Sequence, residues 1–436
     1  MLFELVSSIV VASGLGYLKL KEGKSDANKI EKICRNAGLF IKENGNVKTI
    51  QIQRRTNFEG GTEYAFRIPL GLSFSDFQKK MDTLQDGLNN KKTILDVQWN
   101  DVKEINLKGD IKQQIKELIN KTKIRKEIEM EFDGLLKIRV YNTTLTDNFP
   151  FNDSLLQHCT GWKIPIGTDQ QGILFHDTDK FPHMIVAGLT RYGKTVFLKM
   201  FISTLTHTQP KYVSFSLVDL KGGLAFSRFK NCKQVQMLAT NPTEALSTLK
   251  AVQKNMEQRM KVFQEKGYED IKEAGYKDRH FIIVDEGAEI ASKGETDQVI
   301  KKIKMECESI IADIARRGAG IGYRLIFCTQ YPTADTLPRQ VKQNANAKLC
   351  FYVDTEIASR VVLDESGAEL LPLIPGRAIY RTDRKRTIQT PFIQNDFIDK
   401  IIKPHLVRKD EQHEVPRKTT KRGSDSVEFE EIGLSE

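Results

Sequence analysis

The chain has 436 residues, of which 39% are hydrophobic and 28% are charged, and its formal net charge is +10. This length exceeds what one small core organises, so two or three domains are expected in a largely globular chain. Six scattered cysteines without a Cys-x-x-Cys pair argue against a disulfide framework or a zinc site. The positive charge is compatible with nucleic acid or an anionic membrane surface, although a lysine-rich composition also explains much of it.

An uncharged run near the N-terminus departs from this soluble pattern. Leu5 to Leu18 carries no charge, and Lys19, Lys21 and Lys24 follow it. A membrane span needs about 20 apolar residues, so the run is marginal in length. It predicts a single anchor in residues 1–20 that holds the protein at the cell membrane, with the rest of the chain in the bacterial cytoplasm. A buried or interfacial helix is the alternative.

Residues 27–145 have the pattern of a small α/β domain. Thr62 to Pro69 alternates as a strand does, and a helix is expected to begin near Ser73 or Ser75. A lysine-rich helical stretch further on either lines a nucleic-acid path or forms a solvated helix face. Two further strands are predicted at Ile94–Trp99 and Leu135–Tyr141, and the lysine-rich helix is predicted at Lys108–Lys126.

Residues 150–400 alternate between strands and helices, which predicts a mainly parallel sheet covered on both faces. Thr240 to Gln264 is expected to form a long helix. Residues 405–436 are polar and highly charged, and we expect them to be a disordered tail. The predicted strands are His183–Ala187, Ser214–Leu220, His280–Asp285, Arg324–Thr329 and Lys348–Val353.

A phosphate-binding motif of the form G-x-x-x-x-G-K-[ST] follows the first of these strands and precedes a helical pattern. Its glycines let backbone N–H groups point at a phosphate, and the helix N-terminus adds a partial positive charge. Lys194 is then expected to contact the β- and γ-phosphates of ATP, and the Thr195 hydroxyl to bind Mg²⁺. A glycine-bearing turn before an ordinary helix is the alternative. The motif consists of Gly188, Leu189, Thr190, Arg191, Tyr192, Gly193, Lys194 and Thr195.

Two carboxylates end the apolar strand near residue 285. Because parallel strands end at the edge of the sheet where ligands bind, Asp285 is expected beside the phosphate motif, holding the hydration shell of Mg²⁺. Glu286 is placed to act as the general base for the attacking water. The spacing from the phosphate motif, with one strand between, suits a RecA-like P-loop NTPase of the ASCE type, in which a further strand separates the two.

Four further residues are candidates for the reaction. Gln330 follows an apolar strand and either senses the γ-phosphate or caps a turn before a proline. Arg316 and Arg317 end a helix, where cations are favourable for local reasons alone. One of them is alternatively an arginine finger that reaches the nucleotide of a neighbouring subunit. Arg360 is a third candidate for such an interface.

Several motifs resemble the FtsK/SpoIIIE family of DNA-pumping ATPases, and they occur in the order found in that family over residues 150–395. The resemblance implies an ATPase that uses ATP and Mg²⁺, forms a hexameric ring and translocates DNA largely independently of sequence. Arg191 and Tyr192 stand where the family usually has Gly and Ser, which makes the loop bulkier. The segments that carry the resemblance are Val218–Gly223, Met256–Met260, Ile314–Pro332 and Ala358–Leu371.

The chain leaves no room for the C-terminal winged-helix module of chromosomal family members, and its N-terminal membrane region is reduced to one marginal span. These departures make it look like the coupling proteins of Gram-positive conjugative elements and plasmids, with a relaxase and membrane transfer-channel proteins as partners. Three alternatives remain: a DNA pump for chromosome or plasmid segregation, an ATPase that moves protein cargo as in type VII secretion, and a nucleotide-dependent scaffold without turnover.

Overall fold

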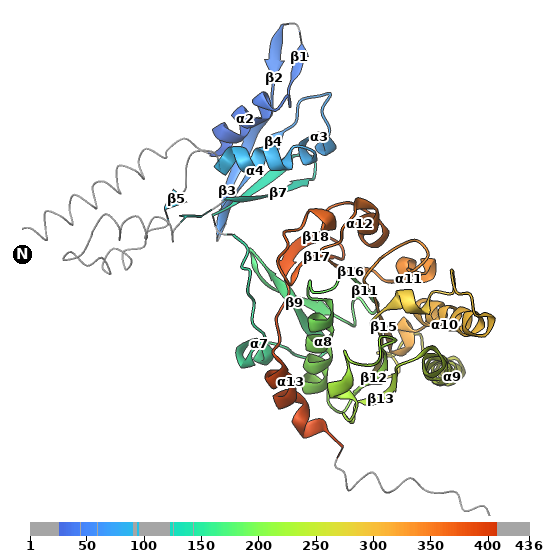
Figure 1. Cartoon of the computed structure of the whole chain (residues 1–436). Helices are drawn as coiled ribbons and strands as arrows, with labels where there is room; N and C mark the ends of the chain where they lie inside the picture. Colours follow the sequence, from blue (N-terminus) through green and yellow to red (C-terminus); the bar gives the residue numbers. More distant parts are fainter. Residues whose placement is uncertain are drawn as a thin grey trace, which may run out of the picture.

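The structure of the chain is a computed structural model (Figure 1). It describes residues 26–407 except 44, 59, 90–93, 96–122, 125 and 143, and at 94–95 and 123–124 it describes the backbone alone. The expected membrane anchor, most of the lysine-rich helix and residues 408–436 of the charged tail lie outside the described residues.

A ten-stranded mixed sheet dominates the structure, in the order β10-β9-β18-β17-β16-β11-β15-β14-β12-β13. The strands from β16 to β13 run parallel, and the remaining four pair antiparallel beyond β16. The parallel strands are β11 (Met184–Ala187), β12 (Val213–Val218), β13 (Val235–Ala239), β14 (Arg279–Val284), β15 (Tyr323–Thr329) and β16 (Ala347–Phe351). The antiparallel strands are β9 (Lys163–Asp169), β10 (Gly172–Asp177), β17 (Arg377–Arg381) and β18 (Lys385–Gln389).

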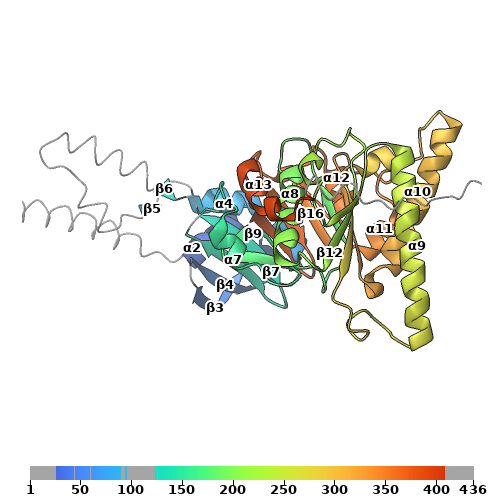
Figure 2. The ribbon, with the colours of Figure 1, turned by 90° about the horizontal axis from the view of Figure 1, so that it is seen from below.

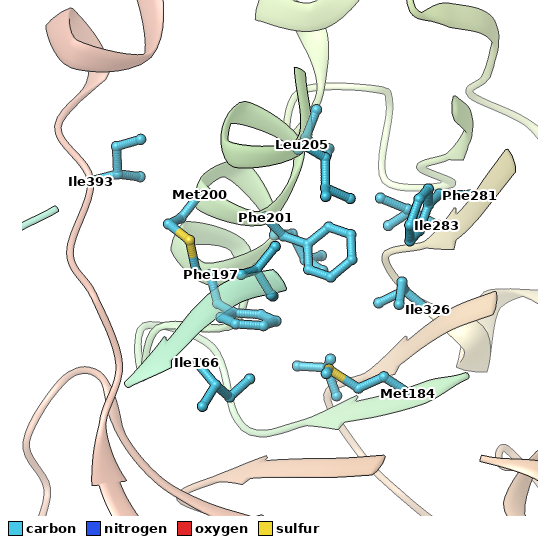
Figure 3. Packing of buried hydrophobic residues seen from close by; sticks show 14 of the residues in the cluster. Ile166, Met184, Phe197, Met200, Phe201, Leu205, Phe281, Ile283, Ile326 and Ile393 are labelled. Atoms are coloured by element: carbon cyan, nitrogen blue, oxygen red, sulfur yellow. The ribbon is translucent and has the colours of Figure 1, made fainter. Parts of the chain in front are cut away.

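Helices cover both faces of this sheet because its central strands are apolar on both sides; every residue of β11, β14 and β15 is buried. On one face, α8 (Lys194–Thr208) packs beside α13 (Asn395–Ile402), with α7 (Asp153–Gln157) nearby. In Figure 3 the side chains of Phe197, Phe201 and Leu205 of α8 point toward those of Met184, Phe281, Ile283 and Ile326 on the strands.

The opposite face carries the longest helices. Figure 2 shows α9 (Pro242–Lys266) and α10 (Gln298–Arg317) side by side on the far side of the sheet from α8. The side chain of Asn241 accepts the N–H of Glu244 at the start of α9, and Gly267 ends this helix with φ 71°. The shorter helices are α11 (Arg339–Asn344) and α12 (Glu356–Leu363) and the 3₁₀ turns are Ser227–Phe229, Gly287–Ile290, Ala319–Ile321, Ala368–Leu370 and Lys403–His405.

A second, four-stranded antiparallel sheet precedes the large one along the chain, in the order β3-β4-β8-β7. Its helices pack against it around a separate core that includes Ile30, Leu84 and Ile138. The strands are β3 (Gln51–Phe58), β4 (Gly61–Arg67), β7 (Glu127–Phe132) and β8 (Leu136–Tyr141), and the helices are α2 (Asp26–Asn36), α3 (Phe74–Gln78) and α4 (Met81–Asn89). Two short strand pairs accompany them, β1 (Ile41–Glu43) with β2 (Asn46–Lys48) and β5 (Ile94–Leu95) with β6 (Lys123–Ile124).

The expected fold class is confirmed: the five predicted strands of the larger region are all present, and β15 lies between β11 and β14, as a RecA-like sheet requires. The expected division into domains at 27–145 and 150–400 stays a prediction.

The expected location at the cell membrane through one N-terminal anchor is wrong. Among the described residues, no helix is long and apolar enough to cross a bilayer. The uncharged run from Leu5 to Leu18 itself lies outside the described residues, and it is shorter than the about 20 residues that a span needs.

Candidate functional site

The phosphate motif forms the turn between β11 and α8, and two of its glycines are required by close backbone approaches. Gly188 has φ 148° and Gly193 has φ 117°. A Cβ atom on Gly188 would lie 2.5 Å from Cβ of Phe351, and one on Gly193 would lie 3.1 Å from the backbone of Gly376. Any larger residue would therefore push the loop off the sheet edge.

Among the described non-glycine residues of this loop, only Arg191 has a positive φ, at 75°. An L-residue pays roughly 1–2 kcal/mol for the left-handed region, which is the physical reason for glycine there. Tyr192 fits without such strain, since its ring packs 5.0 Å from that of Tyr352 and its carbonyl accepts the N–H of Gly376 at 2.9 Å. The bulky pair is accommodated, and only Arg191 is strained.

Lys194 joins the loop to the carboxylates at the end of β14. Its side chain is 3% exposed, and its Nζ donates to the backbone carbonyl of Asp285 at 2.7 Å. The same Nζ lies 3.6 Å from Oδ1 of Asp285 and 3.4 Å from Oε2 of Glu286. Lys194 therefore contacts the two residues that were predicted to bind the metal and to activate water.

Asp285 carries a buried oxygen, Oδ1, that has no hydrogen-bond partner among the described residues. Burial raises the pKa of this carboxyl, and the nearby Lys194 opposes that rise only in part. A buried, unsatisfied carboxylate oxygen is the kind of donor that Mg²⁺ prefers, and the Thr195 hydroxyl follows directly on Lys194, which contacts Asp285. The residues present therefore fit the expected metal.

Glu286 is held by four groups at once. Its carboxylate accepts the Thr329 hydroxyl at 3.1 Å, the backbone N–H of Gln330 at 3.0 Å and the Nζ of Lys221 at 3.1 Å, in addition to the contact with Lys194. Burial raises the pKa of Glu286, but Lys194, the N–H of Gln330 and Lys221 outweigh it and keep the pKa below its ordinary range. The carboxylate is thus ionised and fixed in direction.

Gln330 reaches the phosphate loop directly, because its Oε1 accepts the hydroxyl of Thr190 at 2.9 Å. The structure therefore brings Thr190, Lys194, Asp285, Glu286 and Gln330 together at the carboxyl ends of β11, β14 and β15.

The structure does not bring the three candidate arginines to this site. Arg316 and Arg317 end α10, just before β15 begins, and so lie at the opposite, amino edge of the sheet. Both donate to Asp313, and Arg317 does so to both carboxylate oxygens. Arg360 pairs with Glu356 on the exposed face of α12.

Sequence reasoning missed two parts of the site. Lys221 lies in a segment that was noted only for its resemblance, and nothing in that pattern indicated a contact with Glu286. A cavity of about 400 Å³ also opens beside the phosphate loop. Residues 147–149 and 389–392 line it together with Pro375 and Gly376, far from the loop in sequence and without a recognisable motif.

The chain is similar to known proteins in the region of this site. Residues 160–281 match the FtsK/SpoIIIE family model. The DNA translocase FtsK of Leptospira interrogans serogroup Icterohaemorrhagiae serovar copenhageni (strain Fiocruz L1-130) is 30% identical over 258 residues, 55% of this chain and 26% of the relative. The DNA translocase FtsK of Streptococcus pneumoniae (strain ATCC BAA-255 / R6) is 28% identical over 264 residues, 55% of this chain and 33% of the relative. The chain thus spans a third or less of these relatives.

Solved structures show the same fold. The pCW3 conjugation coupling protein TcpA, in a monomer form with ATPgS, has a TM-score of 0.57 at 19% identity and covers 87% of this chain and 99% of its own. EssC (ATPases 2 and 3) from Geobacillus thermodenitrificans has a TM-score of 0.51 at 16% identity and covers 63% and 53% of the two chains. The chain therefore has the fold of P-loop ATPases, and its residues 160–281 match the FtsK/SpoIIIE family.

Proposed function

We propose that the chain is an ATP-hydrolysing motor that translocates DNA. The observation that carries the proposal is the convergence of Lys194, Asp285, Glu286 and Gln330 at one edge of the sheet, in contact with the phosphate loop. The curated relatives that match this region are DNA translocases. The net charge of +10 suits a polyanionic cargo that is gripped through its phosphates.

Each residue of the site has a defined task in this proposal. Bound Mg²⁺ and the triphosphate supply a polarised γ-phosphorus and a neutralised leaving group. Thr195 and Asp285 would hold the metal, and Lys194 would turn from Glu286 toward the phosphate oxygens. That movement removes one of the donors on Oε2 of Glu286, where Lys221 also binds, so that the carboxylate can accept a proton from the attacking water while Gln330 orients that water.

We propose that several copies assemble as a ring, with six as the number that the family suggests. Large apolar side chains stand exposed around the carboxyl edge, among them Leu224 at 79%, Tyr331 at 59% and Ile357 at 75%. A neighbouring copy would cover them. Arg316 lies too far along the sheet to reach its own nucleotide, so a role as finger requires this neighbour. Its side chain is 63% exposed and donates to one oxygen of Asp313, whereas that of Arg317 is 33% exposed and donates to both.

We further propose conjugative transfer as the process, with a relaxase-bound DNA and transfer-channel proteins as partners, and residues 150–400 as the motor with 27–145 as an accessory domain. The likeness to TcpA over nearly all of both chains supports this. Protein cargo is the second candidate, because EssC shares the fold of the motor. Segregation of a chromosome or plasmid would use the same motor.

The test is the rate of phosphate release from ATP with and without DNA, single-stranded and double-stranded in separate arms. Stimulation by DNA is expected, together with DNA binding that weakens steeply with salt. Glu286→Gln should lower turnover by about 10²–10⁴-fold while ATP still binds, because only the proton acceptor is removed. DNA binding without any stimulation of hydrolysis would count against translocation, and absence of binding at low salt would favour protein cargo.

A further inference from the structure

The outermost strand of the smaller sheet, β3, is open to solvent along nearly its whole length. It pairs with β4, and seven of its eight residues are exposed, whereas Tyr64, Ala65 and Phe66 of β4 are buried. Neighbouring residues of a strand point to opposite faces of its sheet. The unbroken exposed run therefore means that, among the described parts of the chain, both faces of β3 stay open. Long open edge strands are uncommon in proteins unless something binds them.

The two edges of this sheet carry opposite charge. Residues 46–58, which run from β2 to the end of β3, contain Lys48, Arg54 and Arg55 and no acidic residue. At the other edge, β7 has the sequence Glu-Ile-Glu-Met-Glu-Phe, without a basic residue. A polyanion near the smaller sheet is therefore attracted to the β3 edge and repelled by the β7 edge.

The two arginines of β3 lie on opposite faces of the strand. The guanidinium of Arg55 lies over the ring of Tyr64, 6.0 Å from its centroid. On the other face, Nη2 of Arg54 lies 3.8 Å from Oε1 of Glu63, and the arginine side chain stays 61% exposed. Glu63 also receives Nε of Arg139 at 3.0 Å, so it offsets the charge of Arg54 only in part. Two guanidinium groups thus flank one exposed edge of the sheet.

The edge of β3 is poorly suited to pairing with a strand of another protein. The register between β3 and β4 shifts between Ile52 and Arg54, which leaves Gln53 outside the pairing. Such a bulge twists the edge and interrupts the ladder that a further strand would extend. Amide and hydroxyl side chains, which can hydrogen-bond phosphate and sugar oxygens, make up most of the rest of the strand. They are Gln51, Gln53, Thr56 and Asn57. This chemistry favours a nucleic acid over an extended peptide.

We propose that β3 is a nucleic-acid interface, and that Arg54 and Arg55 contact DNA phosphates there without reading sequence. The proposal rests on the proposed function in taking DNA as the polyanion. It adds a contact on the sheet that precedes the large one, outside residues 160–281 that match the family model. Exposed strands are among the elements with which proteins bind nucleic acid.

The test measures DNA binding by the full chain as a function of salt, because each phosphate contact adds a known amount to the salt dependence. Fluorescence anisotropy without nucleotide follows a labelled duplex and a labelled single strand of mixed sequence in separate arms. The double variant Arg54→Gln, Arg55→Gln should bind roughly 10–100-fold more weakly near about 0.1 M salt. Its slope of log affinity against log salt should become shallower by about 1.8 for the duplex or about 1.4 for the single strand.

Two further double variants control for charge and for folding. Arg54→Lys with Arg55→Lys keeps both positive charges and should keep the salt slope of the wild type. Lys79→Gln with Lys80→Gln removes two exposed charges from the same region of the chain, between α3 and α4, and should leave the slope unchanged. Thermal melting followed by circular dichroism shows that each variant is folded.

Unchanged affinity and slope in the folded glutamine variant of β3 overturn the interface and leave the proposed translocation of DNA standing; β3 would then be a surface for an acidic protein. An equal loss in the Lys79 and Lys80 control also overturns the interface, since the effect would then be one of net charge. A wild-type chain that binds neither DNA overturns the proposed function together with the interface, so the two failures are distinguishable.

Discussion

The two edges of the large sheet treat buried charge in opposite ways. At the amino edge, the carboxylate of Asp179 receives Nε of Arg279 at 2.8 Å and Nη2 of Arg324 at 2.9 Å, and Arg324 also donates to the carbonyl of Thr178. At the carboxyl edge, Oδ1 of Asp285 has no hydrogen-bond partner among the described residues.

The pKa values of the two carboxyls follow the same division. Burial raises the pKa of Asp179, but the hydrogen bonds from Arg279 and Arg324 outweigh it and the pKa ends below its ordinary range. Burial raises the pKa of Asp285 and no arginine opposes it. Buried carboxylates whose hydrogen bonds are all made stabilise the fold, whereas a buried carboxylate oxygen without a partner is available to bind a ligand. Substitutions at the two edges should therefore separate activity from stability.

The largest expected effect is at the carboxyl edge. Lys194→Ala should lower the rate of ATP hydrolysis by about 10²–10³-fold, because it removes the donor that is proposed to turn from Glu286 to the phosphates. The melting temperature should change little compared with this loss. Steady-state phosphate release and thermal denaturation measure the two. Lys254→Ala, on the exposed side of α9, is the control that should keep full activity. Retained turnover in Lys194→Ala would remove the site from the proposal.

The amino edge should show the reverse. Asp179→Ala leaves the buried guanidinium groups of Arg279 and Arg324 without their carboxylate, which should lower the free energy of unfolding by about 3 kcal/mol. Urea denaturation measures this loss. The ATP affinity of the folded fraction should match that of the wild type. A variant as stable as the wild type would show that the two edges do not differ in the way described.

A smaller, pH-dependent effect is expected from His183, which is buried just before β11 and accepts the N–H of Leu325. Burial, assisted by Arg324, lowers its pKa from 6.5 to about 4. The unfolded chain therefore takes up a proton below about pH 6.5 that the native chain does not, and stability is lost as the pH falls toward 4.

Between pH 7 and pH 5 this histidine should cost about 2 kcal/mol, and His183→Gln should remove that part of the pH dependence. Urea denaturation at both pH values measures it, with His158→Gln at an exposed position as the control. An identical pH dependence in wild type and His183→Gln would contradict the assignment.

The smallest effect concerns the strained residue of the phosphate loop. Arg191→Gly removes the strain of a left-handed φ, although glycine also raises the conformational entropy of the unfolded chain. The net increase in the free energy of unfolding should be about 0.5–1 kcal/mol. Asp364→Gly is the informative control. Asp364 also has a positive φ, at 63°, but its carboxylate pairs with Lys342 and Lys348, so this variant should lose stability. A loss in Arg191→Gly as well would mean that the arginine side chain makes contacts that outweigh the strain.

Sequence reasoning reached the parts of this molecule whose signal is local. Short apolar runs such as 281–284 favour buried strands, and the topology of a parallel sheet then placed the polar residues at their carboxyl ends, Asp285 and Gln330, at the common edge. The antiparallel strands β9, β10, β17 and β18 were not predicted, because their sequences mix polar and apolar residues without a clear period.

Residues 147–149 and 389–392, which line the cavity beside the phosphate loop, were not predicted for a different reason. Phe149 and Phe392 are brought together by backbone pairing between segments more than two hundred residues apart in the chain, and no spacing rule reports such a contact. The contact of Lys221 with Glu286 likewise depends on how a loop folds back over the sheet edge.

The pairing of Phe151 with Phe392 has a consequence for how such a motor is joined to other parts. The segment that leads into the large sheet region lies one hydrogen bond from the segment between β18 and α13. A module attached ahead of this pairing would leave the ten-stranded sheet and its ligand edge undisturbed. A flanking module can thus be gained, lost or exchanged while the large sheet and its site stay the same.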